Sequence, residues 1–228
     1  MKNIWGNRWF MMPVLLFFTV GLALVYFVPY GDEILFFNDL RQEPFNAVFR
    51  FITHLGEAYA YIICGVAALF WRYRFALLIA LTGLATLPTA FVAKETFDTD
   101  RPISFFKNQG MYSDIVTVPG VELHTGQTSF PSGHTMAGFG LYSILTLMAG
   151  KKKRRWGFAL ALAAISVGVS RIFLVQHFLP DVLSGAFLGL LVSSLVWRLD
   201  GTPFFQRMHW LDGRLSWGNK KVDTAGTE

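Results

Sequence analysis

The chain has 228 residues, of which 53% are hydrophobic and only 15% are charged, and it includes 23 Phe and 7 Trp. Soluble domains carry about 25% charged residues on average, so this composition argues against a soluble globular protein. The formal net charge is +5, but the basic residues gather in short runs beside apolar stretches. We therefore expect them to orient the chain in a membrane, and we expect no nucleic-acid partner. A single cysteine, Cys64, cannot form an internal disulfide or a cysteine-based metal site.

Six apolar stretches could cross a bilayer, which takes about 20 mostly apolar residues per helix. They cover roughly residues 10–28, 58–71, 75–93, 135–149, 156–173 and 182–197. The second and fourth are short, so we expect the second to reach back toward His54 and the fourth to begin at Ser132. The first resembles a signal peptide, but its apolar run is long and no small-x-small cleavage site follows, which favours an uncleaved helix. The predicted fold class is all-α, a polytopic membrane protein with six transmembrane helices in one domain over residues 1–200.

Lys and Arg collect before the first stretch, between the second and third, between the fourth and fifth, and after the sixth. Such runs mark the cytoplasmic side, so both termini are expected in the cytoplasm, with residues 201–228 as a frayed polar tail. Between the first two stretches, residues 33–52 carry apolar side chains at loosely helical spacing. They predict two short amphipathic helices broken near Pro44, which either lie in the outer interface or pack against the bundle.

Three short polar clusters interrupt this apolar sequence, and in the six-helix topology all of them lie on the non-cytoplasmic side. They are Lys94 with Arg101-Pro102, then Pro131-Ser132-Gly133-His134, and finally Ser170-Arg171 with His177 and Asp181. Ionisable groups near membrane depth are costly and are usually functional. The three clusters are therefore expected to build one site.

The residue types in these clusters suit phosphoryl transfer, which depends on positioning and on neutralising negative charge. The lysine and the two arginines supply fixed positive charge, and arginine adds bidentate geometry toward phosphate oxygens. The serine and glycine that open the fourth stretch lie at a helix N-terminus, where free N–H groups favour anions. The two imidazoles can act as nucleophile and acid, and Asp181 can accept a hydrogen bond from His177.

The patterns Lys-x6-Arg-Pro, Pro-Ser-Gly-His and Ser-Arg-x5-His-x3-Asp, over residues 94–181, resemble the three-part signature of the type-2 phosphatidic acid phosphatase (PAP2) superfamily. The resemblance implies a lipid phosphatase with a six-helix core that needs no metal or other cofactor. It implies that His177 is the nucleophile and forms a phosphohistidine, that Asp181 orients it, and that His134 is the acid toward the leaving group. The residues that would hold the phosphate are Lys94, Arg101, Ser132, Gly133 and Arg171. One departure is Asp100, which precedes Arg101 where many relatives carry another basic residue.

The function expected from the sequence is hydrolysis of a lipid phosphate or diphosphate at the outer face of a membrane, a bacterial inner membrane by the length and charge pattern. Undecaprenyl diphosphate, phosphatidylglycerol phosphate, phosphatidic acid and lipid A phosphates all fit, with recycling of a polyprenyl carrier as the first expectation. An alternative is a phosphotransferase that passes the phosphoryl group to a second lipid. A protein that only binds or flips a lipid is a third reading, but binding alone needs no nucleophile. His54 and His124 could also touch a headgroup, and the oligomeric state stays open.

Overall fold

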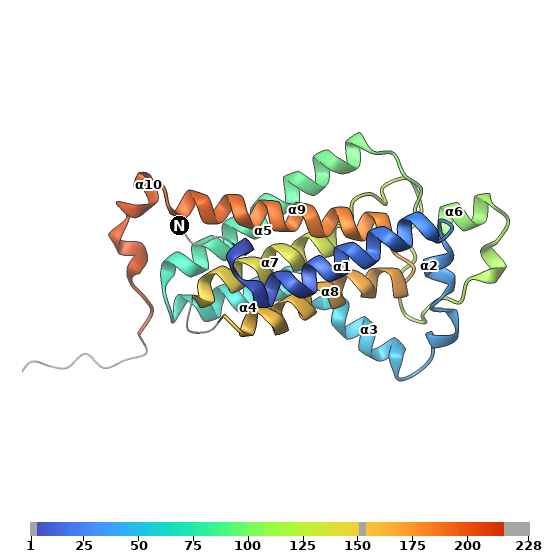
Figure 1. The fold of residues 1–228 in the computed structure, drawn as a ribbon, viewed down its shortest axis with the longest axis horizontal. Helices are drawn as coiled ribbons and strands as arrows, with labels where there is room; N and C mark the ends of the chain where they lie inside the picture. Colours follow the sequence, from blue (N-terminus) through green and yellow to red (C-terminus); the bar gives the residue numbers. More distant parts are fainter. Residues whose placement is uncertain (1–3, 151–153, 217–228) are drawn as a thin grey trace, which may run out of the picture.

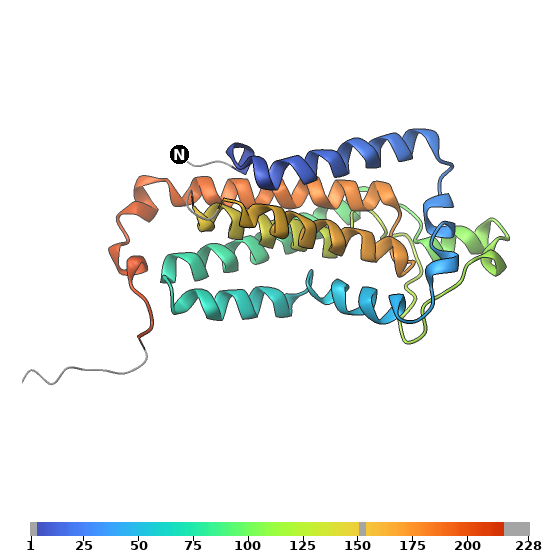
Figure 2. The same ribbon diagram turned by 60° about the horizontal axis from the view of Figure 1, so that its bottom comes forward.

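The computed structural model describes residues 4–150 and 154–216 of the chain. These residues form an elongated bundle of helices with connecting segments at both ends (Figures 1 and 2). The long helices are α1 (Arg8–Phe27), α4 (Ala58–Leu69), α5 (Tyr73–Thr96), α7 (Gly133–Ala149), α8 (Trp156–Phe173) and α9 (Leu179–Asp200). The all-α fold class is confirmed, and each predicted apolar stretch corresponds to one of these helices.

Short helices occupy the two ends of the bundle. One end carries α2 (Asp32–Leu35), the 3-10 helix η2 (Asn38–Leu40), α3 (Phe45–His54), α6 (Pro102–Asn108) and η3 (Tyr112–Asp114). The opposite end carries η1 (Ile4–Gly6), α10 (Pro203–Gln206) and η5 (His209–Asp212). Because the first and last described residues lie at the same end, the chain enters and leaves the bundle on one side.

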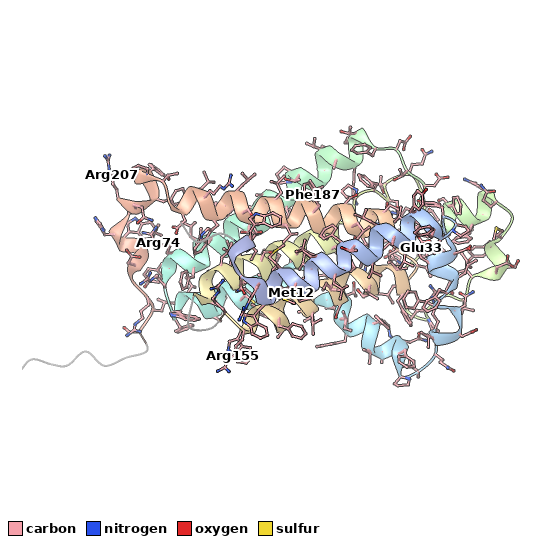
Figure 3. The ribbon with its side chains drawn as sticks, viewed as in Figure 1. Met12, Glu33, Arg74, Arg155, Phe187 and Arg207 are labelled. Atoms are coloured by element: carbon pink, nitrogen blue, oxygen red, sulfur yellow. The ribbon has the colours of Figure 1, made fainter. Side chains whose placement is uncertain are left out.

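Four helices of the described residues are long and apolar enough to cross a membrane: α1, α5, α8 and α9. The pair α3 and α4 passes the same test as one span that bends by 56° at its break, which gives up to five. The central helix α7 has 17 residues. Four or five crossings are thus supported, while the sixth stays a prediction. Large apolar side chains such as Met12 and Phe187 are exposed along the flank of the bundle (Figure 3), as a lipid-facing surface requires.

Helix α7 is the core of the bundle and packs against α5, α8 and α9. The crossing with α9 is very close, since a Cβ added to Gly189 would lie 2.4 Å from the carbonyl oxygen of Met136. Only glycine permits such an approach of two backbones. The close crossing continues to the helix starts, where the N–H of Ser132 donates to the carbonyl of Asp181 at 3.0 Å. Packing in the core therefore joins the second and third polar clusters.

The other end of the bundle is fastened by Arg74 at the start of α5. Its guanidinium pairs with Asp200 at 2.8 Å and with Asp212 at 3.2 Å. The main chain after α9 also bonds to the bundle, because the N–H of Leu215 donates to the carbonyl of Leu69 at 2.9 Å. The expectation of a frayed tail is wrong for residues 202–216, and residues 217–228 lie outside the described chain. Figure 3 shows Arg74, Arg155 and Arg207 at this end and Glu33 at the opposite end.

The segment over residues 33–52 packs against the bundle, which is one of the two readings of its amphipathic pattern; its position in the outer interface stays a prediction. Helix α3 begins directly after Pro44, as predicted, while only a single turn of α-helix and one 3-10 turn precede it. On one side the ring of Phe49 stacks on Phe173 of α8 with centroids 4.0 Å apart. On the other side Phe51 is exposed, so α3 packs on the bundle with one face and leaves the other face uncovered.

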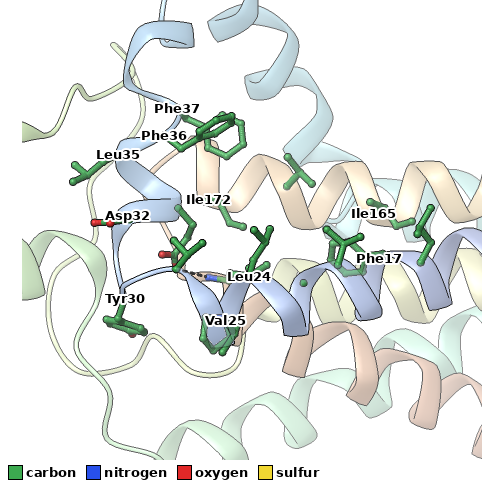
Figure 4. A pocket seen from close by; sticks show the side chains of 18 of the residues that line it. Phe17, Leu24, Val25, Tyr30, Asp32, Leu35, Phe36, Phe37, Ile165 and Ile172 are labelled. Carbon is green, nitrogen blue, oxygen red and sulfur yellow. Dashed lines mark hydrogen bonds between the residues drawn. The ribbon is translucent and has the colours of Figure 1, made fainter.

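A cavity of about 970 Å³ opens between α1, α2 and α8. Its walls are almost entirely apolar and include Phe17, Leu24, Ile165 and Ile172, while Tyr30 and Asp32 line its outer end (Figure 4). Such a lining suits hydrocarbon and disfavours water.

Candidate active site

The residues predicted to form one site come together at the end of the bundle that carries α2, α3 and α6. Lys94 lies near the end of α5 and Arg101 directly precedes α6, while His134 is in the first turn of α7. Arg171 is in the last turn of α8, and Asp181 is in the first turn of α9. The termini of five helices thus bring residues from distant parts of the chain to one end of the bundle.

The turn between α8 and α9 couples Arg171 to His177. The N–H groups of Gln176 and His177 both donate to the carbonyl of Arg171, at 2.9 and 3.3 Å. Val175 has a φ of 58°, a left-handed conformation that costs a β-branched residue about 1–3 kcal/mol. The tight turn brings the guanidinium of Arg171 and the imidazole of His177 close together. The packing around the turn must offset the backbone strain at Val175.

Arg101 and Arg171 are both buried, and each has N–H donors without a strong hydrogen-bond partner. Arg171 donates from Nη1 to Thr53 Oγ1 at 2.6 Å, while its buried Nε has no partner among the described residues. Arg101 makes only long contacts, at 3.4 Å to the carbonyl of Gln176 and 3.4 Å to Thr128 Oγ1. Burial lowers the pKa of Arg101, and the charge of Asp181 opposes that effect. Buried guanidinium donors without strong partners are suited to an incoming anion.

His177 and Asp181 form a buried pair, and each side chain is 3% exposed. His177 Nδ1 lies 3.5 Å from Asp181 Oδ2, too far and too poorly aligned for a formed hydrogen bond. That oxygen instead accepts from Ser129 Oγ and from the N–H of Phe178. Burial lowers the pKa of His177 to about 3, against the raising effect of Asp181. The ring is therefore a neutral imidazole, the form that can act as a nucleophile.

The start of α7 offers backbone donors beside the serine hydroxyl. Ser132 is fully buried, and its Oγ accepts from Thr135, at 3.4 Å from the N–H and 2.8 Å from the hydroxyl. Its own N–H donates to Asp181, so within the described chain the unpaired N–H groups of this turn are those of Gly133 and His134. A Cβ on Gly133 would meet no atom within 4 Å, which leaves open space where an anion can approach.

Lys94 is half-buried and makes no polar contact within the described residues. The charges of Arg101, Arg171 and Asp181 are near enough to act on its ammonium group. His124 lies exposed on the loop between α6 and α7, and the structure brings it to none of the predicted site residues. His54 is likewise exposed, but it joins the site through a residue that the sequence did not single out.

That residue is Glu57, at the break between α3 and α4. Its Oε1 lies 3.3 Å from His134 Nε2, and its Oε2 lies 3.0 Å from His54 Nδ1. Sequence reasoning also missed Thr53 and Ser129, the partners of Arg171 and Asp181. A signal for Glu57 was present, since it is an acidic residue three positions after a histidine and directly before an apolar stretch, on the predicted outer side.

Comparison with known proteins identifies the family. The model of the PAP2 superfamily matches residues 57–204, which is more than half of the chain and contains all three clusters. The chain belongs to the PAP2 superfamily. The matched region of this PAP2 protein begins at Glu57, so the missed carboxylate lies inside it.

Two curated relatives and one solved structure agree with this assignment. Phosphatidylglycerophosphatase B of Bacillus subtilis is 30% identical over 174 residues, which cover 71% of this chain and 78% of that protein. Bacitracin transport permease protein BcrC of Bacillus licheniformis is 28% identical over 181 residues, with coverages of 78% and 84%. The crystal structure of a transmembrane PAP2-type phosphatidylglycerolphosphate phosphatase of B. subtilis superposes with a TM-score of 0.58 at 26% identity, covering 85% of this chain and 96% of that chain. The protein is a membrane phosphatase of the PAP2 type.

Proposed function

We propose that this protein hydrolyses a lipid phosphate or diphosphate on the side of the membrane away from the cytoplasm, through a phosphohistidine on His177. The observation that carries the proposal is the meeting of three cations, two imidazoles and two carboxylates at one end of an apolar bundle. Cations neutralise the phosphoryl oxygens, and the paired imidazoles supply a nucleophile and an acid. No described cluster of three or more His, Cys, Asp or Glu side chains is placed to hold a metal ion, and metal independence stays a prediction.

The sidedness of the proposal rests on how charge is divided between the two ends. The end opposite the site carries the basic residues that precede α5, precede α8 and follow α9: Arg72, Arg74, Arg154, Arg155, Arg198 and Arg207. The site end carries the acidic residues of α2 and its neighbours. Positive residues favour the cytoplasmic side of a membrane, so the site end faces the periplasm or the outside, in a bacterial inner membrane.

The proposed reaction has two steps. Because Nδ1 of His177 faces Asp181, its Nε2 attacks the phosphorus as the bond to the leaving oxygen breaks, and His134 gives that oxygen a proton. A water molecule then attacks the phosphohistidine, its proton returns to His134, and the N–P bond breaks to release phosphate. Lys94, Arg101, Arg171 and the N–H groups of Gly133 and His134 hold the phosphoryl oxygens through both steps. Most of the rate enhancement comes from this positioning and charge stabilisation.

A lipid is the proposed substrate because the site opens at the end of a bundle whose flanks are apolar and exposed. A lipid can then present its headgroup while its chains stay in the membrane. Phosphatidylglycerol phosphate leads the four candidate lipids, since the names of two of the proteins compared above refer to its phosphatase. Undecaprenyl diphosphate, phosphatidic acid and lipid A phosphates complete the panel to be tested.

The test is phosphate release by the purified protein and by His177→Ala, in detergent with EDTA, on that four-lipid panel. We expect release by the wild type only, with a loss in the variant of at least about 10⁴-fold. Acid quenching during turnover should trap phosphate on the wild-type chain and none on the variant. An inactive wild type on every lipid, with a normal unfolding transition, would contradict the proposal. Transfer to an added acceptor lipid in place of release would identify a phosphotransferase.

A further inference from the structure

The break between α3 and α4 is built into the site by close packing. A Cβ added to Gly56 would lie 2.8 Å from the carbonyl oxygen of His134 and 2.5 Å from Val167 Cγ1. Two tyrosine hydroxyls fasten the same corner to α7, from Tyr142 to the carbonyl of Leu55 at 3.1 Å and from Tyr61 to that of Ala137 at 2.8 Å. The position of this corner is therefore fixed relative to the start of α7.

The corner presents Glu57 to two imidazoles at once. Glu57 occupies the N-cap position of α4, where an acidic residue would stabilise the helix, but its side chain makes no capping hydrogen bond. Its two oxygens lie instead beside His134 Nε2 and His54 Nδ1. The Glu57 side chain is 25% exposed, less than the side chains of His134 at 35% and His54 at 61%, so the carboxylate lies between two rings that are more open to solvent. A helix cap would not require two histidines, so the arrangement points to a role in the site.

A carboxylate on one ring nitrogen fixes the tautomer of an imidazole and favours its protonated form. Since Nε2 of His134 faces Glu57, the nitrogen left for the substrate is Nδ1, which has no partner among the described residues. Burial disfavours a protonated His134 ring most, and the charges of Arg171 and Lys94 also repel a proton on it. Glu57 is the one described carboxylate in contact with that ring, so it must offset both burial and the two cations if His134 is to be an acid near neutral pH.

We propose that Glu57 is the positioning residue of the acid half of the site: it holds the Nε2–H of His134, so that Nδ1 gives the proton to the leaving oxygen. His54 contacts the same carboxylate from the solvent side and thereby weakens the effect of Glu57 on His134. The inference rests on the proposed function. In the first step the leaving oxygen takes the proton of Nδ1 as the P–O bond breaks, and His134 becomes neutral. In the second step Nδ1 takes a proton from the attacking water as the N–P bond breaks, so the ring ends the cycle as it began.

The test compares pH profiles of kcat for wild type, Glu57→Gln and His54→Ala on the fastest lipid of the panel. Glu57→Gln should lower kcat about 10- to 100-fold, within the range of a general acid, with KM changed less than about threefold because the phosphate ligands remain. The basic limb of the pH profile of Glu57→Gln should move to lower pH, since the imidazolium of His134 loses its counter-charge. His54→Ala should lower kcat less than about threefold and move the basic limb to higher pH, since Glu57 then serves His134 alone.

Matched controls are Glu122→Gln in the segment between η3 and α7 and His209→Ala in η5, both of which replace exposed side chains and should leave the profile unchanged. In a His134→Ala background, Glu57→Gln should cause no further loss, because its effect passes through His134. Glu57→Asp, which keeps the charge, should retain the wild-type basic limb even if kcat falls. The inference fails if active wild type and Glu57→Gln agree within threefold, if the double variant loses more than His134→Ala, or if Glu57→Asp shifts the limb as Glu57→Gln does. An inactive wild type would instead refute the proposed function.

Discussion

The two carboxylate–imidazole pairs of this site are built in opposite ways. Asp181 and His177 are four residues apart, 3% exposed, and separated by 3.5 Å. Glu57 and His134 are 77 residues apart, 25% and 35% exposed, and separated by 3.3 Å. The first pair is set by one turn of chain and is closed to solvent. The second pair depends on how the corner between α3 and α4 packs against α7, and it is partly exposed to solvent.

This difference matches the different tasks proposed for the two histidines. A nucleophile must stay unprotonated, and burial achieves that for His177 at the expense of solvation. An acid must gain and lose a proton in each cycle, which is easier with a shared carboxylate near solvent. The same residue types thus acquire different chemistry from their surroundings.

The largest expected effect comes from breaking the buried pair. Asp181→Asn should lower kcat about 10³-fold, more than any substitution of Glu57, because the amide cannot balance the charge that forms on His177 during attack. The side chain keeps its volume and can still accept from Ser129, so folding should change little. Steady-state kinetics with a thermal unfolding control measure this. If Asp181→Asn lowers kcat no more than Glu57→Gln does, the buried pair does not contribute more to catalysis than the exposed pair, and the prediction is wrong.

Titration of the histidines should sharpen the comparison. Burial lowers the pKa of His177 to about 3, so its ring should not protonate between pH 5 and 8, whereas an ordinary histidine titrates near 6.5. Because the unfolded chain binds a proton there and the folded chain does not, this residue contributes stability above pH 6.5 that is lost as the pH falls toward 3. NMR of ¹⁵N-histidine-labelled protein in micelles, with His177→Ala for assignment, measures it. A His177 resonance that titrates near 6.5 contradicts the prediction.

The smallest expected effects concern the packing that holds each pair. Gly189→Ala forces α7 and α9 apart and should destabilise the protein by about 1–3 kcal/mol. Gly56→Ala should move the helix corner away from His134 and lower kcat a few-fold, with the basic limb displaced to lower pH as in Glu57→Gln. Thermal unfolding and pH profiles of both variants separate the two outcomes. If both variants lose the same free energy of unfolding and Gly56→Ala keeps the wild-type pH profile, then the two glycines do not have the different roles proposed for them.

The sequence predicted the site residues that share a short segment better than those that depend on contacts between distant helices. The six helices follow from hydrophobic stretches, and His177, Asp181 and Arg171 sit in one short segment whose spacing alone brings them together. Thr53, Glu57 and Ser129 could not be found in this way, because each acts on a partner from another part of the chain. Their roles depend on the crossing of helices, which no local pattern specifies.

The packing of residues 202–216 against the bundle was missed for a similar reason. Arg74 was interpreted as a residue that orients the chain, but it also binds Asp200 and Asp212, and those ion pairs form only when the end of α9 and η5 lie beside the start of α5. Whether the chain crosses the membrane six times, as the charge pattern predicts, depends on α7. Its 17 residues are surrounded by other helices and need not match the thickness of the bilayer.

His177 is buried, whereas His134 and Glu57 are partly exposed to solvent. This difference affects how reactants and products enter and leave the site. In the proposed mechanism the phosphoryl group would lie against the closed side formed by His177 and the two arginines, while the side formed by His134 is more open. If the departing lipid and the incoming water both pass on that open side, the lipid must leave before water can enter. The rate at which the lipid leaves would then decide whether water or an acceptor alcohol reaches the phosphohistidine first.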